Sequence, residues 1–163
     1  MIQNNIVLIG FMGSGKTTLA RELSKICDAF VLDSDCLIEQ RVGMCISEYF
    51  EYFGEKAFRE QERLFIEWAS ISVQNCVIAT GGGMPIYNDV HPMGQVVFLS
   101  LDFETICRRM VDSECAKRPL FSNIDEARQL FYSRQKYYEQ SANIIVDAAI
   151  PPKRLAKEIL TLL

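Results

Sequence analysis

Short runs of aliphatic residues alternate along the chain with longer segments in which hydrophobic positions recur every three or four residues. Runs of this kind, without a polar residue at every second position, are typical of strands buried on both faces of a parallel sheet. The pattern predicts such strands over residues 5–10, 30–33, 76–80, 95–100 and 143–147.

The segments between these strands have the spacing of amphipathic helices. Helices are predicted from about residue 15, over 36–41, over 55–72, after Asp102, over 125–141 and from Pro151. A short helical turn over 47–53 is expected to end at Gly54, because glycine weakens helices. The hydrophobic rows expected on two of these helices are Phe58, Phe65 and Ala69 beside Leu64, Trp68 and Ile71, and then Leu155, Ile159 and Leu162.

The alternation of buried strands and helices predicts an α/β fold, with a parallel sheet between two layers of helices. In such folds, ligands bind beyond the carboxyl ends of the strands. The first three predicted strands all end in unusual motifs, namely the glycine-rich run 10–15, the carboxylates Asp33 and Asp35, and the glycines 81–83. We therefore expect the functional site at this edge of the sheet.

The composition indicates a single globular domain spanning residues 1–163. Of the 163 residues, 49% are hydrophobic and 23% are charged, which argues against both a disordered chain and an integral membrane protein. The formal net charge of −4 provides no overall attraction to nucleic acids or anionic membranes. No signal-type segment is found near residue 1, and we predict a cytoplasmic protein.

The cysteines and the histidine give little support for a zinc site. The chain has 6 cysteines and 1 histidine, His91, and no two cysteines form a C-x-x-C pair. We expect reduced thiols that pack as small apolar side chains. The cysteines are Cys27, Cys36, Cys45, Cys76, Cys107 and Cys115.

Residues 10–17, GFMGSGKT, match the full G-x-x-x-x-G-K-[ST] pattern of a phosphate-binding P-loop. The match lies between a predicted strand and a predicted helix, where backbone N–H groups and the helix N-terminus attract phosphate. Lys16 is predicted to reach the β- and γ-phosphates, and the Thr17 hydroxyl to ligate Mg²⁺. The predicted nucleotide contacts in this region are Gly13, Ser14, Gly15, Lys16, Thr17 and Thr18.

A P-loop by itself leaves three outcomes open, which are ATP hydrolysis, a GTP-dependent switch and phosphoryl transfer to an acceptor. Asp33 and Asp35 bear on this choice, because one carboxylate can order the water shell of Mg²⁺ while the other meets an acceptor hydroxyl. The alternative is that Asp35 only caps the helix that follows. Beside this P-loop we favour a functional role for both carboxylates.

Two arginines, Arg59 and Arg134, lie on predicted helices in positions suited to an anionic ligand. Arg134 falls on the hydrophobic row of its helix, so its guanidinium needs an anionic partner. Together with the second glycine loop, formed by Gly81, Gly82 and Gly83, these arginines suggest a pocket for a small carboxylate. The alternative, a structural ion pair with a glutamate, is strongest for Arg59.

The polar, aperiodic segment 112–123 is predicted to be a lid over the transferred phosphate. Arg118 would meet the charge that spreads over the γ-phosphate oxygens, and closure would exclude water. The alternative is a solvated surface loop, which we accept for Lys117.

Taken together, these motifs resemble those of the shikimate kinase family in order and spacing, over nearly the whole chain. The matching stretches are GFMGSGKT, LDSD, GEKAFREQE, IATGGG, RPLF and SRQKYYEQSA. The resemblance implies a three-layer α/β/α sandwich with a five-stranded parallel sheet of order 2-3-1-4-5, a P-loop NTPase fold of nucleoside-monophosphate-kinase type. It also implies an acceptor-binding region over about residues 34–62 and a lid over about residues 112–123.

The reaction implied by this resemblance is transfer of the γ-phosphate of ATP to the 3-hydroxyl of shikimate, in chorismate and aromatic amino acid biosynthesis. Both arginines would bind the shikimate carboxylate, and Asp35 would hold the ring hydroxyls and act as the base. The residues implied to bind shikimate are Asp35, Arg59, Gly81, Gly82, Gly83 and Arg134. Family members are often monomers, and we expect a monomer here.

On the ATP side of the site, the resemblance implies that Thr17 and Asp33 order Mg²⁺, and that Asp33 does so through a water molecule. Lys16 and Arg118 would contact phosphate and take part in catalysis, and Arg109 would lie by the adenine.

Two stretches depart from the family pattern. The segment between Arg109 and Arg118 is slightly longer than in some members, and the exit of the fifth strand, VDAAIPP, lacks an evident polar group for the adenine.

Three other functions compete with this interpretation. A gluconate kinase would share the P-loop and the sheet, but FRE, GGG and a helix-borne Arg134 argue against it. A nucleoside-monophosphate kinase would need more groups to recognise a base. A module that binds ATP or shikimate without catalysis would have no need of Lys16, Asp35 and Arg118 together.

Overall fold

The computed structural model describes residues 4–111 and 123–163, and it contains one parallel sheet of order β2-β3-β1-β4-β5. This arrangement confirms the predicted strand order and fold class. The strands are β1 (Ile6–Ile9), β2 (Phe30–Asp33), β3 (Cys76–Ala79), β4 (Gln95–Ser100) and β5 (Ile144–Asp147). The helices are α1 (Lys16–Cys27), α2 (Ser34–Val42), α3 (Ile46–Ser72), α4 (Met84–Tyr87), η1 (a 3₁₀ turn, His91–Met93), α5 (Phe103–Val111), α6 (Ile124–Ser141) and α7 (Pro152–Leu162).

The position of β1 at the centre of the sheet explains why polar and apolar residues do not alternate in the first apolar run. It pairs with β3 on one side and with β4 on the other, so that Val7 lies opposite both Ile78 and Val96. All four residues of β1 are buried, because helices cover both faces of the sheet. The loop that follows β1 therefore begins at the middle of the carboxyl edge of the sheet.

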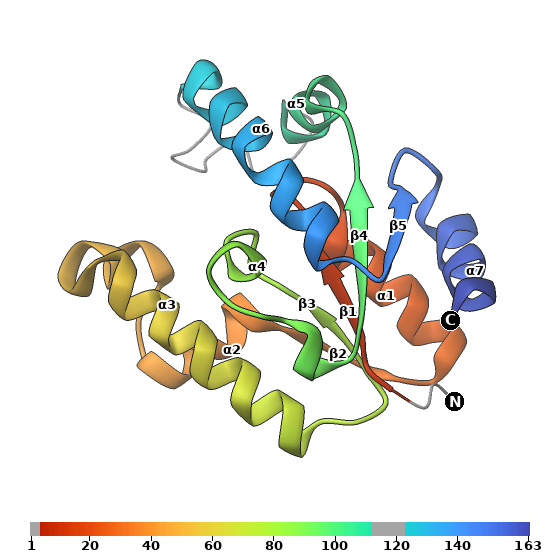
Figure 1. The fold of residues 1–163 in the computed structure, drawn as a ribbon, viewed down its shortest axis with the longest axis horizontal. Helices are drawn as coiled ribbons and strands as arrows, with labels where there is room; N and C mark the ends of the chain where they lie inside the picture. Colours follow the sequence, from red (N-terminus) through yellow and green to blue (C-terminus); the bar gives the residue numbers. More distant parts are fainter. Residues whose placement is uncertain (1–3, 112–122) are drawn as a thin grey trace.

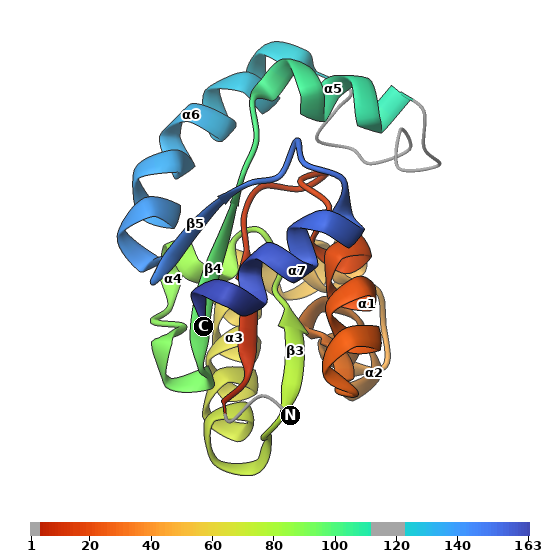
Figure 2. The same ribbon diagram turned by 90° about the vertical axis from the view of Figure 1, so that its right-hand side faces the viewer.

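Two layers of helices enclose the sheet (Figures 1 and 2). Helices α1 and α7 pack against each other on one face, and α3, α4 and α6 lie on the other. The apolar faces of α1 and α7 are buried, with Leu19 and Leu23 on α1 and Leu155 and Ile159 on α7. This layering is what an alternating strand and helix pattern predicts.

Several helix boundaries and faces differ from the sequence prediction. Helix α2 begins at Ser34 rather than near 36. The break predicted at Gly54 is confirmed, because its φ of 77° and ψ of 170° are not helical and divide α3 into two helical parts. Of the three residues predicted on one face of α7, Leu155 and Ile159 are buried in the core, whereas Leu162 is 58% exposed. Trp68 and Ile71 are also exposed, and only one of the two rows predicted for α3 is fully in the core.

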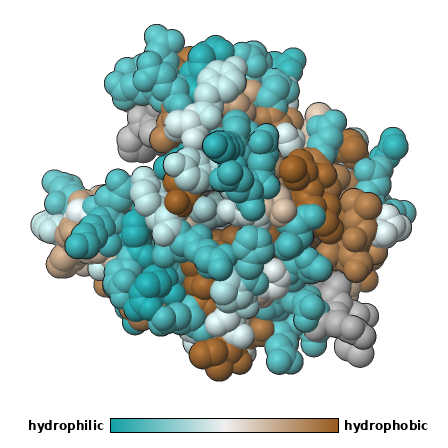
Figure 3. Space-filling view, in the orientation of Figure 1, coloured by the Kyte–Doolittle hydropathy of each residue, from teal (hydrophilic) through white to brown (hydrophobic). Residues whose placement is uncertain are grey.

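The surface carries no sign of a bilayer-spanning segment. Within residues 4–111 and 123–163, no helix combines the length and the apolar character needed to cross a membrane. The face shown in Figure 3 is largely hydrophilic, and hydrophobic residues gather over β5 and α7. The cysteines of the described part, all except Cys115, are free thiols, but Cys36 and Cys45 are exposed, so the prediction that they pack as small apolar side chains is wrong for these two.

Candidate active site

The P-loop connects β1 to α1 through backbone conformations that favour glycine. Gly13 and Gly15 have φ values of 77° and 98°, a region that residues with a Cβ rarely adopt. A Cβ on Gly13 would also lie 3.1 Å from the sulfur of Met110. The loop is thus packed against α5 and opens toward the N-terminus of α1, where backbone N–H groups attract phosphate.

Lys16 and Thr17 are the first two residues of α1, and both side chains reach across the mouth of the loop. Lys16 Nζ donates hydrogen bonds to the carbonyl oxygens of Gly10 and Phe11, at 2.8 and 3.0 Å. Thr17 Oγ1 donates to Asp33 Oδ2 at 3.3 Å. The structure therefore brings together Thr17 and Asp33, the two residues that the sequence assigned to the metal.

Asp33, not Asp35, caps the helix that follows β2. Its Oδ1 accepts hydrogen bonds from the backbone N–H groups of Asp35 and Cys36, at 3.1 and 3.3 Å. The suggestion that Asp35 serves only as a helix cap is wrong, because Asp33 already fills that position. One carboxylate oxygen of Asp33 thus accepts hydrogen bonds from the start of α2, and the other accepts one from Thr17. Asp35 lies in the first turn of α2.

Asp35 lies directly against the second glycine loop. A Cβ on Gly81 would overlap the carboxylate of Asp35, and Gly81 N donates to Ser34 Oγ at 2.9 Å. These contacts join the carboxyl ends of β2 and β3, which are neighbours in the sheet. A side chain at position 81 would therefore displace the carboxylate of Asp35.

Arg59 packs on the other end of the same loop. A Cβ on Gly83 would lie 2.5 Å from Arg59 Nη1 and 2.9 Å from Cζ. The guanidinium is 15% exposed, and its carbon lies 4.2 Å from the centre of the Tyr87 ring on α4. The glycine loop thus has the candidate base at one end and a cation at the other.

Two glutamates hold Arg59 in this position. Nη1 donates to Glu62 Oε2 at 2.8 Å, and Nη2 donates to Glu55 Oε1 at 2.6 Å. The structural ion pair foreseen for Arg59 is therefore present, but it coexists with the contact on the glycine loop. Each terminal nitrogen carries two hydrogens and uses one in these bonds, which leaves donors for an acceptor carboxylate.

Glu62 is a buried carboxyl that the sequence analysis did not single out. Its side chain is 1% exposed, and its Oε1 has no hydrogen-bond partner within the described residues. Burial raises the pKa of Glu62 to about 7, although the hydrogen bond and charge of Arg59 oppose this shift. The ion pair between Glu62 and Arg59 could have been predicted from the sequence, because the two residues are three positions apart on a predicted helix.

Arg134 approaches this cluster from α6. Its charge helps to lower the pKa of Glu55, after the hydrogen bond from Arg59, and also counteracts the effect of burial on Glu62. None of the ion pairs formed among residues 4–111 and 123–163 includes Arg134. The half-buried guanidinium therefore remains suited to the external anion predicted from the sequence.

Arg109 lies on the donor side and links the P-loop to the exit of β5. Nη1 donates to the carbonyl oxygen of Ser14 at 3.3 Å, and Nη2 donates to that of Ala148 at 2.8 Å. Thr18 is exposed in the first turn of α1. Arg118 and Cys115 lie outside the described residues, as does nearly all of the predicted lid.

Comparison with known proteins decides the family. The sequence model described as "Shikimate kinase" matches residues 12–163. The chain belongs to the shikimate kinase family. A shikimate kinase of Helicobacter hepaticus is 49% identical over 156 residues, which cover 96% of this chain and 93% of that protein. The predicted ATP-dependent kinase of shikimate is thereby confirmed.

Solved structures separate this family from the rival kinase. A shikimate kinase from Acinetobacter baumannii in complex with shikimate matches with a TM-score of 0.85 and 31% identity, covering 98% of this chain and 92% of that one. A gluconokinase from Sinorhizobium meliloti matches with a TM-score of 0.60 and 16% identity, covering 98% and 90%. The second match reflects the shared fold alone, so the gluconate kinase alternative is not supported.

Gly83→Ala should damage the acceptor side of this kinase through Arg59. The φ and ψ of Gly83 are −90° and −22°, which alanine adopts without backbone strain. The new methyl group would instead collide with a guanidinium that two glutamates hold in place. We expect the KM for shikimate to rise about tenfold, equivalent to ~1.4 kcal/mol, with a lower melting temperature.

The matched variant is Gly82→Ala, whose methyl group would meet no described protein atom closer than 3.5 Å. Its melting temperature should therefore stay near that of the wild type. Steady-state kinetics and thermal melting of the two variants test the contact, and equal melting temperatures would contradict it.

Glu62→Gln should change the pH dependence of stability. The folded-state pKa of Glu62 is raised from 4.5 to about 7, so the folded protein binds its proton more tightly than the unfolded chain does. The resulting stabilisation is fully present below pH 4.5 and is lost as the pH rises through about 7. We expect the wild type to lose up to ~3 kcal/mol more than the variant over this range.

Urea unfolding of both proteins at several pH values measures this difference. Glutamine is neutral throughout, so its curve supplies the baseline. Parallel curves for the two proteins would show that Glu62 has an ordinary pKa.

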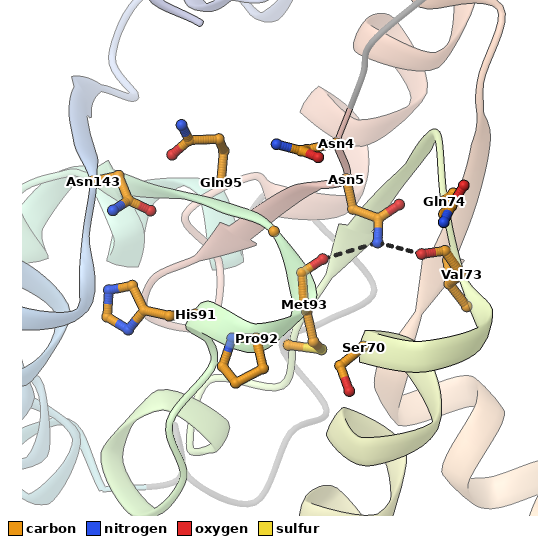
Figure 4. Close-up of a pocket in the computed structure, with 11 residues that line it drawn as sticks. Asn4, Asn5, Ser70, Val73, Gln74, His91, Pro92, Met93, Gln95 and Asn143 are labelled. Atoms are coloured by element: carbon orange, nitrogen blue, oxygen red, sulfur yellow. Dashed lines mark hydrogen bonds between the residues drawn. The ribbon is translucent and has the colours of Figure 1, made fainter.

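A polar pocket at the opposite edge of the sheet is not part of this site (Figure 4). It is lined by residues at the amino ends of strands, among them Asn5, Gln95 and Asn143. Asn5 Nδ2 donates to the carbonyl oxygens of Val73 and Met93, both at 2.8 Å. Its side chain therefore ties the ends of α3 and η1 to the sheet, and parallel strands place the P-loop at the other edge.

Proposed function

We propose that this chain transfers the γ-phosphate of ATP to the 3-hydroxyl of shikimate. The observation that carries the proposal is the glycine loop 81–83, which contacts Asp35 at one end and Arg59 at the other. A carboxylate and a cation at opposite ends of one loop suit a small acceptor with hydroxyls on one side and a carboxylate on the other. Shikimate has this arrangement of groups.

In the proposed mechanism, Arg59 and Arg134 bind the carboxylate of shikimate and orient its ring. Asp35 accepts a hydrogen bond from the reacting hydroxyl and takes its proton as the hydroxyl oxygen bonds to the γ-phosphorus, while the bond from that phosphorus to the bridging oxygen breaks and ADP leaves. The loose transition state of phosphoryl transfer demands positioning more than covalent chemistry. The rigid packing of Asp35 and Arg59 on a glycine loop would provide that positioning.

On the donor side, we propose that Gly13, Ser14, Gly15 and Thr18 cradle the phosphates with Lys16, and that Arg109 lies by the adenine. Thr17 and Asp33 fit Mg²⁺, because their oxygens are 3.3 Å apart and this ion prefers a few protein oxygens together with phosphate and water. No group of three or more His, Cys, Asp or Glu side chains that could hold a metal ion is found in the described residues. Mg²⁺ would neutralise phosphate charge when bound.

The remaining assignments stay proposals that rest on the sequence. The acceptor-binding region over about residues 34–62 is supported by the placement of Asp35, Arg59 and Glu62 on α2 and α3. The lid over 112–123, with catalytic Arg118, rests on the sequence pattern. We also propose a monomer in the cytoplasm that binds neither nucleic acid nor membrane, and gel filtration with light scattering tests the oligomeric state.

The experiment that tests the function is ADP release from MgATP in the presence of shikimate, gluconate, AMP or no acceptor. Fast release with shikimate alone is expected, and EDTA should abolish it. Release with another acceptor would overturn the assignment of the acceptor site. Absence of release with all four, from folded protein that binds ATP, would favour a binding module.

A further inference from the structure

Tyr138 is a buried tyrosine on α6 whose hydroxyl reaches the second glycine loop. The side chain is 0% exposed, and its ring stacks on Phe98 of β4 with the ring centres 5.3 Å apart. Its hydroxyl donates a hydrogen bond to the carbonyl oxygen of Gly82 at 2.6 Å. This bond connects residues 56 positions apart in the sequence.

The same hydroxyl also interacts with Arg134, which lies four residues earlier and one helical turn away. The positive charge of Arg134 acts on this hydroxyl, whose proton is donated to the carbonyl oxygen of Gly82. Burial raises the pKa of Tyr138 to about 12, although Arg134 opposes the shift. The phenol therefore keeps its proton at neutral pH and can donate it to Gly82.

We infer that Tyr138 is a positioning residue of the acceptor site, whose hydroxyl fixes the carbonyl of Gly82 and with it the second glycine loop. This inference rests on the proposed function of the site. Tyr138 joins groups from three parts of the chain, which are the loop after β3, the strand β4 and the helix α6.

The position of Gly82 in the loop explains why one hydrogen bond matters. Gly81 and Gly83 flank it and contact Asp35 and Arg59. A shift of the Gly82 carbonyl would therefore move the backbone against the base and the first arginine.

The competing explanation is that Tyr138 is only a packing residue of the core. The two explanations concern different parts of the Tyr138 side chain. A packing role depends on the ring, whereas a positioning role depends on the hydroxyl. Tyr138→Phe keeps the ring and its stacking on Phe98 but removes the hydrogen bond to Gly82. Tyr137→Phe removes a hydroxyl from the adjacent, half-exposed tyrosine of the same helix and serves as the matched control.

We expect Tyr138→Phe to raise the Kd and the KM for shikimate about tenfold, the effect of one hydrogen bond, while the KM for ATP stays within about twofold. Tyr137→Phe should leave all of these constants unchanged. Calorimetric titration with shikimate and steady-state kinetics measure them. Wild-type turnover with shikimate is recorded separately, since its absence would refute the proposed function rather than the role of Tyr138.

An unchanged shikimate affinity in Tyr138→Phe would overturn the inference, and so would equal rises in the KM values for shikimate and ATP. Phe98→Leu supplies a second test that does not alter the hydroxyl. It removes the stacking partner and should lower the melting temperature with a smaller effect on shikimate affinity. A loss of shikimate affinity as large as that of Tyr138→Phe would indicate a packing role and would also overturn the inference.

Discussion

Asp35→Asn is expected to lower kcat with shikimate by about 10²- to 10⁴-fold, the range typical of a lost general base, and to leave the affinity for MgATP unchanged. Asparagine has nearly the same shape but cannot take the proton of the acceptor hydroxyl. The contact with Gly81 and the start of α2 should survive, because Asp33 caps that helix and Asp35 does not.

This separation of roles makes the variant informative. Steady-state kinetics gives kcat, and titration with a fluorescent ATP analogue gives nucleotide affinity. Asp125→Asn, an exposed carboxylate in the first turn of α6, is a control that should retain full activity. Turnover close to that of the wild type in Asp35→Asn would remove Asp35 from the mechanism.

Arg134→Ala is expected to raise the Kd for shikimate about 100-fold, or ~2.7 kcal/mol, with little change in ATP affinity. The guanidinium is half-buried and forms no ion pair within the described residues, so a bound carboxylate would be its main anionic partner. Truncation would leave that carboxylate with Arg59 alone, whose charge Glu55 and Glu62 already share.

Lys136→Ala is the matched control, because it removes an exposed cation from the same helix. Its shikimate affinity should equal that of the wild type. Calorimetric titration of each variant with shikimate and with MgATP measures the effect. Equal losses for the two ligands in folded Arg134→Ala would assign the residue a structural role.

Much of the donor site was predictable from short stretches of sequence. The P-loop is contiguous, and its function follows from local backbone conformation at Gly13 and Gly15 and from the helix that starts at Lys16. The proximity of Thr17 and Asp33 also followed, because Asp33 ends β2 and the P-loop after β1 brings Thr17 to the same carboxyl edge of the parallel sheet. The order of the strands, by contrast, came from the family resemblance rather than from periodicity.

The sequence alone therefore determined the fold class, the phosphate-binding loop and the edge of the sheet that carries the site. These features depend on local hydrophobic patterns and on contiguous motifs, which can be read without knowing what packs against them. Only the tertiary structure decided that Arg59 has two glutamate partners, that Glu62 is buried with a raised pKa, and that Tyr138 holds Gly82. Burial and contacts between distant segments depend on how α3, α4 and α6 pack over the sheet, and no local pattern specifies that packing.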